Sequence, residues 1–409
     1  MRSRTATSTR RALAATAALV LSAPLPALAG PCDVLPTPIV YVAGPDSLIQ
    51  VLQGVGAALY GEVTIVYKGY PACLGIDNVV NSNRTTPDPA EPNDHTATYW
   101  PGLGAPSTLC DLPWDGVGEV VPDVAISDVF ASTCKSYPNG LSGVADFQGP
   151  VMSYAYVVPP VSKAKSISAE AAYLVWGFGA DAAHQVSPWT DPALLYHRDE
   201  HSGSENLFAK VIGVDVTKFK GQSFNSTGLI KAAIQGASAA DADKILGMLN
   251  ANNLDENRSS LRMLAYQHYD QSCGYLPDSD GDSFDKRNVR DGHYPLWAPL
   301  HLYTLASNGE PSSPSVKRFI HLVLGTEQID GVDPIQLEAT PPSHLIPQCA
   351  MRVSRTEDGG ALASFSPQSP CGCRFESLAG SPSASCQPCS TSDTCPSEAP
   401  RCSYGFCES

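Results

Sequence analysis

Hydrogen-bond donors gather in one short stretch of the sequence, residues 198–205 (RDEHSGSE). They are the guanidinium of Arg198, the hydroxyls of Ser202 and Ser204, and the backbone N–H of Gly203. The serine–glycine run opens a segment with helical spacing, and a helix N-terminus presents unpaired N–H groups and the positive end of the helix dipole. The guanidinium is a planar fork that suits two oxygens, and we expect Glu200 to hold it in place. The pattern predicts a site for a tetrahedral oxyanion, although a serine-capped helix with a solvated arginine explains it equally well.

Two other turns carry the same kind of chemistry. In residues 44–48 (GPDSL) a strand passes through a glycine turn into a helix, which makes Ser47 and Leu48 candidate ligand residues. Ser127 and Asp128 follow another expected strand, and ligands of open α/β sheets bind at the carboxyl ends of strands. A carboxylate there can accept a proton from a partly protonated oxyanion but repels a fully deprotonated one. Plain helix caps and turn residues are the competing explanation at both positions.

The spacing of apolar residues predicts an α/β fold around these turns. Residues 38–43 and 62–67 are expected strands and 47–60 the helix between them, a unit that favours a parallel sheet. Further strands are expected at 121–127, 150–158, 261–266 and 294–305, and helices at 168–178, 203–212, 226–237, 239–251 and 314–324. Residues 81–119 have little periodicity, and we interpret them as a long surface loop closed by Cys73 and Cys110.

Residues 1–29 have the order of a secretory signal peptide. Four arginines precede an apolar stretch at residues 12–20, which is too short to span a bilayer, and residues 27–29 (ALA) offer a cleavage site. Removing this segment takes the formal net charge from -15 to -19, because it carries four arginines and no acid. A strongly acidic chain is unsuited to nucleic acid and to anionic membranes. We therefore expect an exported protein, in the periplasm, on the cell surface or secreted.

Thirteen cysteines in an exported chain predict disulfides, and the odd number leaves one without a partner in the same chain. Seven of them lie in residues 371–407, within a segment rich in serine, proline and glycine. Such a segment cannot bury a core of its own. We therefore expect residues 346–409 to be a small disulfide-stapled tail that takes no part in the ligand cleft.

The three turns occur in an order that resembles the phosphate-binding receptors of ABC transporters, a branch of the type 2 periplasmic-binding proteins. Residues 44–48 resemble the first ligand loop of that family, and residues 67–69 (YKG) resemble the strand before its second loop. Residues 125–128 (AISD) resemble its A-S-D segment, and residues 198–204 its R-x-D-x-S-G-T signature. Residues 294–303 and 314–324 resemble its last strand and its last helix. The second loop of the family carries a Ser-Ser-Gly-Gly run, whereas this chain has PACLG at residues 71–75 and lacks that hydroxyl.

The resemblance implies a two-lobed α/β receptor of the type 2 periplasmic-binding fold, with the ligand in the cleft between the lobes. One lobe is expected to comprise residues 37–149 and 261–345 and the other residues 150–260, so that the chain crosses near 150 and 260. The ligand residues are then Ser47, Leu48, Ser127 and Asp128 from the first lobe, and Arg198, Ser202, Gly203 and Ser204 from the second.

The resemblance also implies a monomer that binds phosphate or a related oxyanion without catalytic residues, cofactor or metal, and it allows an ABC permease as a partner. Three other functions stay open: a receptor of the same fold for another anion or a small carboxylate, an envelope or surface adhesion protein, and a secreted hydrolase. Residues 278–282 (DSDGD) begin like a calcium loop, but Ser283 and Val289 stand where an EF-hand has glycine and glutamate. His197 and His201 have the spacing of a zinc pair without a third ligand.

Overall fold

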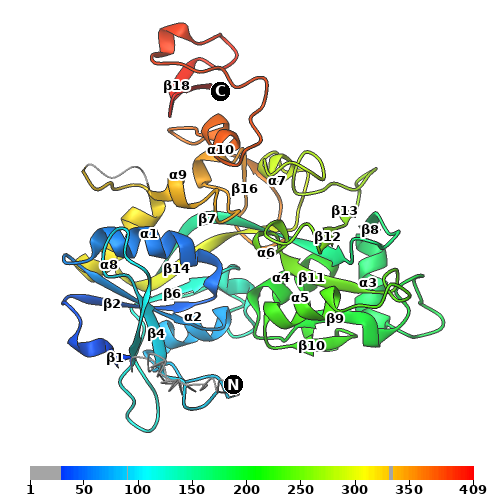
Figure 1. Cartoon of the computed structure of the whole chain (residues 1–409), viewed down its shortest axis with the longest axis horizontal. Helices are drawn as coiled ribbons and strands as arrows, with labels where there is room; N and C mark the ends of the chain where they lie inside the picture. Colours follow the sequence, from blue (N-terminus) through cyan, green and yellow to red (C-terminus); the bar gives the residue numbers. More distant parts are fainter. Residues whose placement is uncertain (1–28, 90, 331–334) are drawn as a thin grey trace, which may run out of the picture.

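The computed structural model describes residues 29–89, 91–330 and 335–409, so residues 1–28 of the expected signal peptide lie outside the described ranges. The strands of the body form one long mixed sheet in the order β1-β5-β4-β3-β2-β6-β14-β7-β11-β9-β10, with β12 beside β7 and β15 beside β14. Figure 1 shows the early strands (blue and cyan) at one end of the molecule and the green strands at the other. The predicted α/β fold is confirmed.

The first half of the sheet is built on the strand–helix–strand unit expected near the N-terminus. β2 (Ile39–Gly44) runs parallel to β3 (Thr64–Gly69) on one side and to β6 (Val124–Ser127) on the other. Between them, α1 (Ile49–Leu59) buries one face with helical spacing, made of Val51, Leu52, Val55 and Leu59. After β3, α2 (Ala72–Asn81) packs against β6. Three carboxyl ends of parallel strands therefore lie together at one edge of this half.

The second half repeats this arrangement. β11 (Leu246–Asn250) and β10 (Gln222–Phe224) run parallel to the strand between them, β9 (Leu195–Arg198). Each of these strands leads into a helix: α4 (Gly203–Ile212), α5 (Thr227–Gln235) and α6 (Ala251–Asp255). The half also holds β8 (Ser166–Ser168) and α3 (Ala169–Phe178), which begins where the Ser168 hydroxyl accepts a hydrogen bond from the Ala171 N–H at 3.2 Å.

Two long antiparallel strands, β7 (Val144–Val158) and β14 (Trp297–Ser307), connect the halves. β7 pairs with β14 over its first part and with β11 over its last part. We expected the chain to return near residue 260, but β12 (Arg262–Met263) and β13 (Ala265–Gln267) still pair with β7 and β8. The next strand along the chain that pairs with the first half is β14, which lies beside β6.

Two expected segments differ in the structure. Residues 81–119 are not a loop throughout, because β4 (Thr96–Tyr99) and β5 (Thr108–Asp111) extend the sheet beyond β3, and β1 (Gly30–Pro31) pairs with β5. The expected helix at 239–251 is replaced by turns and β11. Residues 246–249 (LGML) are a short apolar run that is buried on both faces. The spacing of apolar residues in such a run does not distinguish a strand from a helix.

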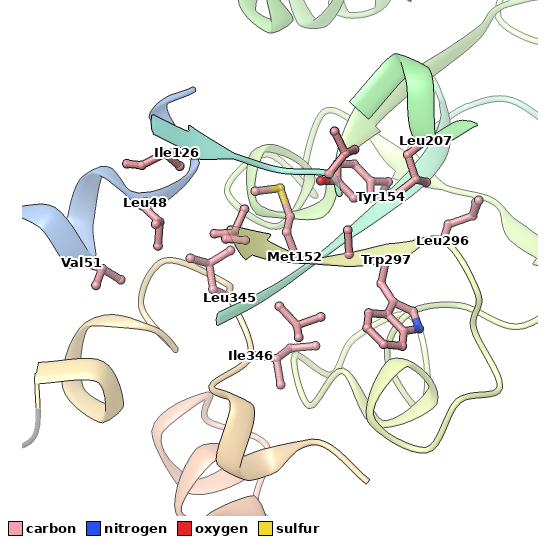
Figure 2. Packing of buried hydrophobic residues seen from close by; sticks show 14 of the residues in the cluster. Leu48, Val51, Ile126, Met152, Tyr154, Leu207, Leu296, Trp297, Leu345 and Ile346 are labelled. Atoms are coloured by element: carbon pink, nitrogen blue, oxygen red, sulfur yellow. The ribbon is translucent and has the colours of Figure 1, made fainter. Parts of the chain in front are cut away.

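The main hydrophobic core runs through both halves and continues into the segment that we expected to be a tail. Figure 2 shows Leu345 and Ile346 packed beside Met152 of β7, among residues from α1, β6 and β14. Val151 and Ile346 exchange two backbone hydrogen bonds of 2.7 and 2.9 Å. The same buried cluster includes Ala350, Met351, Cys371 and Phe375. The body therefore does not end at residue 346, because apolar side chains as far as residue 375 share its core.

Twelve of the thirteen cysteines form disulfides: Cys32–Cys110, Cys73–Cys134, Cys349–Cys371, Cys373–Cys386, Cys389–Cys402 and Cys395–Cys407. The remaining one, Cys273, is exposed. The expected Cys73–Cys110 bridge is wrong, because Cys110 lies on β5 beside β1 and Cys32, whereas Cys73 opens α2. The expectation of a disulfide-rich C-terminal region is confirmed.

The remaining elements follow β14 or precede it closely. They are α7 (Arg287–Arg290), β15 (Glu310–Pro311), α8 (Pro314–Leu324), α9 (Ile335–Ala339), β16 (Val353–Ser354), β17 (Ala363–Ser364), α10 (Gly372–Leu378), β18 (Arg401–Ser403) and β19 (Phe406–Glu408). Among the described residues, no helix has both the length and the apolar character needed to cross a bilayer.

Candidate oxyanion-binding site

The carboxyl ends of six strands open onto one cavity of about 480 Å³. Its lining residues follow β2, β3 and β6 in the first half and β9, β10 and β11 in the second. They are Pro45, Asp46, Ser47, Gly69, Tyr70, Pro71, Ala72, Asp88, Asp128, Arg198, Ser202, Gly203, Ser204, Asn225, Ser226, Thr227, Gly228, Asn250 and Asn253. The strands of each half are parallel, so the cavity lies where ligands of open α/β sheets bind.

The guanidinium of Arg198 is held in this cavity by the second half of the sheet. Its Nε donates to the Phe224 carbonyl and its Nη1 to the Thr227 hydroxyl, both at 3.2 Å. Its backbone N–H donates at 3.2 Å to Glu205, a buried carboxyl whose pKa burial raises well above its usual value. Glu200, which we expected to hold Arg198, instead lines a neighbouring cavity of about 670 Å³. Arg198 is therefore anchored by β10 and α5, and other guanidinium N–H groups stay available to a ligand.

The N-terminus of α4 borders the cavity with Ser202, Gly203 and Ser204. Ser202 is the N-cap and is buried, and its hydroxyl lies 2.9 Å from the hydroxyl of Ser204 rather than on a backbone N–H of the helix. The Asn206 side chain donates to the Ser202 carbonyl at 2.8 Å and fixes the entry of the chain into the helix. The first turn of α4 thus presents two hydroxyls and backbone N–H groups that no side-chain cap satisfies.

Asp128 faces this helix start from the first half. A Cβ atom built on Gly203 would lie 2.0 Å from Asp128 Oδ1 and 3.1 Å from Val129 Cγ2, so only a glycine allows this approach. Asp128 is 6% exposed, and no hydrogen-bond partner among the described residues reaches its Oδ1. Burial raises the pKa of Asp128 to about 6, against the lowering effect of its own backbone N–H and of Arg198. The carboxyl is thus a buried acceptor aimed at the start of α4.

The charge lining the cavity is mostly negative. Asp46, Asp88 and Asp128 line it together with one cation, Arg198. The N-terminus of a second helix, α5, also borders the cavity and adds the positive end of a helix dipole. There, Ser226 accepts a hydrogen bond from the Leu229 N–H at 3.3 Å. Such a lining disfavours a fully deprotonated anion and favours a ligand that also carries a donor group.

Two predicted site residues do not line the cavity, and several residues that do were missed. Leu48 is fully buried in the core, and the Ser127 hydroxyl donates to the Val129 carbonyl at 2.7 Å. Missed residues follow β10 and lie at the end of β11 and in α6: Asn225, Ser226, Thr227, Asn250 and Asn253. Ser226 was recognisable as a helix cap, but neither β10 nor β11 was predicted, so nothing placed these residues at strand ends.

The weaker metal candidates have other partners. Asp278 of the calcium-like run binds Lys286 at 2.8 Å and Arg258 at 2.7 Å, so its oxygens already face two cations. Asp280 accepts from the N–H groups of Asp282 and Ser283, as in an Asx turn. His197 is buried and its Nδ1 donates to the Arg198 carbonyl at 2.7 Å, whereas His201 is exposed and lines the neighbouring cavity.

Comparison with known proteins shows what this arrangement is similar to. No protein-family model matches the chain, and no curated protein matches it. Among solved structures, a Clostridium perfringens protein assigned to phosphate ABC transport and solved with bound phosphate is 13% identical, with a TM-score of 0.51, covering 76% of this chain and 99% of its own. The chain has a periplasmic-binding fold.

Two further structures with this periplasmic-binding fold match over similar lengths. An ABC-type phosphate transport receptor of Vibrio cholerae is 12% identical with a TM-score of 0.45, covering 70% of this chain and 93% of its own. A phosphate binding protein of Stenotrophomonas maltophilia is 12% identical with a TM-score of 0.43, covering 76% of this chain and 91% of its own. The match to the Clostridium perfringens protein confirms the periplasmic-binding fold predicted from the sequence, and the ligand has to be argued from the site itself.

Proposed function

We propose that this protein is an extracytoplasmic solute-binding protein that holds a small oxyanion, phosphate in the first place, in the cavity at the six strand ends. The observation that carries the proposal is the buried Asp128 Oδ1, an acceptor to which no described residue donates a hydrogen bond, beside a helix N-terminus and Arg198. An unpaired buried acceptor costs about 1–3 kcal/mol, and a ligand O–H group would remove that cost.

The roles of the other side chains follow from their positions. Arg198 offers its guanidinium N–H groups to two ligand oxygens, and Ser202, Ser204 and the first N–H groups of α4 donate to the others. Ser47 adds a hydroxyl from the first half. Phosphate near neutral pH accepts these donors and still carries a proton for Asp128, whereas sulfate has no proton to give.

The cavity is bounded by both halves of the sheet, which supports the two-lobed arrangement, with the return to the first lobe near residue 297. Enclosing an anion between the two lobes would exclude water and strengthen each hydrogen bond. The proposal involves no chemical step and no cofactor. Export belongs to the same proposal and is supported by the arginine-rich, apolar start of the sequence. The proposed role also implies an ABC permease as partner.

Calorimetric titration of phosphate-stripped protein tests the proposal. We expect phosphate to bind with a dissociation constant at or below about 1 μM, which corresponds to about 8 kcal/mol. Sulfate, arsenate, phosphonates and small carboxylates, titrated in parallel, identify a different ligand of the same cavity. If none of these anions produces heat or raises the melting temperature, the proposed function is wrong.

A further inference from the structure

Residues 349–371 form a closed loop on the surface of the body, which we call the strap. A disulfide joins Cys349 to Cys371 at its base, and β16 and β17 pair antiparallel between them as a hairpin. Both cysteines belong to or pack against the main core, so the base of the strap is fixed to the body. The turn of the hairpin, residues 355–360, makes the contacts that matter for the site.

One of these contacts holds the loop that carries Asp128. Asp358 is fully buried, and its Oδ2 accepts hydrogen bonds from the Phe130 N–H at 2.9 Å and from the Thr133 hydroxyl at 2.7 Å. Phe130 stands two residues after Asp128. The next N–H, that of Ala131, donates to the Tyr303 hydroxyl at 2.8 Å. Asp358 therefore fixes the backbone directly behind the Asp128 carboxyl.

The neighbouring residues of the turn contact α4. The Glu357 carboxylate accepts from Lys210 Nζ at 3.0 Å. Gly359 adopts a φ of +67°, and a Cβ atom there would lie 3.0 Å from Val211 Cγ2, so the backbone of the turn rests directly on the helix. Lys210 and Val211 stand seven and eight residues after Gly203, which at about 1.5 Å per residue places this contact about 10–12 Å along the helix from the cavity.

The turn is also tied to β14. The Arg355 guanidinium lies 3.8 Å above the Trp297 ring, and its Nη1 donates to the carbonyls of Pro295 and Trp297 at 3.1 and 3.2 Å. Arg355 is 4% exposed. A buried, hydrogen-bonded cation against an aromatic face is a rigid attachment. The strap is thus fixed at its disulfide base, at β14 and at both elements that meet in the cavity.

We propose that the strap positions the two halves of the anion site relative to each other, with Asp358 as its positioning residue. The Asp128 loop and α4 touch at Gly203, and the strap joins the same two elements again behind the cavity. Two separate connections hold the loop and the helix at a fixed distance and angle, whereas one contact allows them to pivot. This inference rests on the proposed oxyanion function only for its effect on affinity.

Two pairs of variants test the strap. Asp358→Ala removes both hydrogen bonds, whereas Asp358→Asn keeps an amide oxygen that can accept them. The double variant Cys349→Ser/Cys371→Ser opens the base, and Cys389→Ser/Cys402→Ser removes another short-range disulfide, outside the strap. If Asp358→Ala does not fold, Thr133→Val removes one of the two bonds alone.

The first measurement needs no ligand. Spin labels at Gln53 of α1 and Leu229 of α5, in a Cys273→Ser background, report the distance between the halves. We expect a narrow distance distribution in the wild type, in Asp358→Asn and in Cys389→Ser/Cys402→Ser, and a broader one in Asp358→Ala and Cys349→Ser/Cys371→Ser. Unchanged widths in both strap variants would overturn the proposal.

The second measurement is the affinity for inorganic phosphate by calorimetry. Loss of the two hydrogen bonds behind the site predicts binding about fivefold weaker or more in Asp358→Ala, with wild-type affinity in Asp358→Asn. Release of the strap at its base should weaken binding in Cys349→Ser/Cys371→Ser as well. A broader distance distribution with unchanged affinity would also overturn the positioning role. If the wild type itself does not bind phosphate, the proposed function fails, and the distance measurement alone decides whether the strap holds the halves together.

Discussion

Asp128 Oδ1 and Gly203 are so close that a Cβ atom at the glycine would lie 2.0 Å from the oxygen. The two residues come from different halves of the sheet, 75 positions apart in the sequence. The carboxyl of one strand end thus lies against the first residue of the helix that follows another strand end. This relationship brings Asp128 of the first half beside Ser202, Gly203 and Ser204 of the second, and all four line the same cavity.

Gly203→Ala should separate the effect on the ligand from the effect on folding. The added methyl group meets the far end of the Asp128 side chain, which can rotate away, and alanine favours a helix by about 1 kcal/mol over glycine. We therefore expect near-normal stability in urea, with phosphate affinity reduced about tenfold or more because Asp128 is displaced. Gly177→Ala in α3 is the matched control, since its Cβ would meet Val214 at an ordinary 3.4 Å. Wild-type affinity in Gly203→Ala would remove the Asp128–Gly203 contact from the site.

Arg198→Ala should weaken phosphate binding at least about tenfold, because a hydrogen bond to a charged group is worth about 1.5–3 kcal/mol. Arg198→Lys should recover only part of this loss, since an ammonium cannot reproduce the anchoring to both Phe224 and Thr227. Calorimetry on both variants, with circular dichroism to verify the fold, is the measurement. Equal affinities for wild type and Arg198→Ala would contradict the assignment of the guanidinium.

The buried Asp128 carboxyl should make stability depend on pH. Its pKa of about 6 lies above the value of about 4 expected in the unfolded chain, so the folded state binds the proton more tightly. The resulting stabilisation is complete below about pH 4 and is lost as the pH rises through 6, by an amount on the order of 3 kcal/mol. Asp128→Asn does not titrate, so urea unfolding should show it more stable than the wild type near pH 7.5 and nearly equal to it near pH 4. A difference that stays constant with pH would mean that Asp128 is solvated.

The same carboxyl should decide between phosphate and sulfate. Above pH 6 an ionised Asp128 accepts the phosphate proton and repels sulfate, and below pH 6 the protonated form can itself donate to sulfate. We expect Asp128→Asn to bind sulfate more tightly and to narrow the affinity ratio of the two anions. Competition titrations of wild type and variant at pH 5 and pH 8 measure this ratio. The proposal fails for Asp128 if neither the substitution nor the pH changes the ratio.

Much of the fold could be predicted because its strands and helices follow local spacing. α4 begins at Gly203 and ends at Ile212, the bounds that the sequence predicts: Ser202 stands at the N-cap position, and Gly213 closes the helix with a φ of +75°. α8 likewise has the predicted bounds, with a proline in its first turn. β11 was missed because its burial comes from β7 and β9, which are distant in the sequence and leave no period in the strand itself.

The part of the cavity lining that could be predicted is the part that local sequence patterns specify. Arg198 and residues 202–204 form a local pattern, and Asp128 directly follows a recognisable strand. Thr227 and Asn250 reach the cavity only because β10 and β11 pair beside β9, which is a long-range relationship. The contacts of Asp358 with Phe130 and Thr133 span more than two hundred residues, and no local pattern predicts them.

The two disulfides of the first half are interleaved, Cys32 with Cys110 and Cys73 with Cys134. If cysteines paired in the order in which they occur in the chain, Cys32 would join Cys73 and Cys110 would join Cys134. Neither of these pairs is present in the structure. Thiol–disulfide exchange has to correct them, and the thiolate of another cysteine attacks the wrong bond in that reaction. The strap, by contrast, joins cysteines that are neighbours in the sequence order and closes without exchange. The native pairs of the first half thus require the exchange of any pair formed between consecutive cysteines, whereas the native pair of the strap is itself a pair of consecutive cysteines.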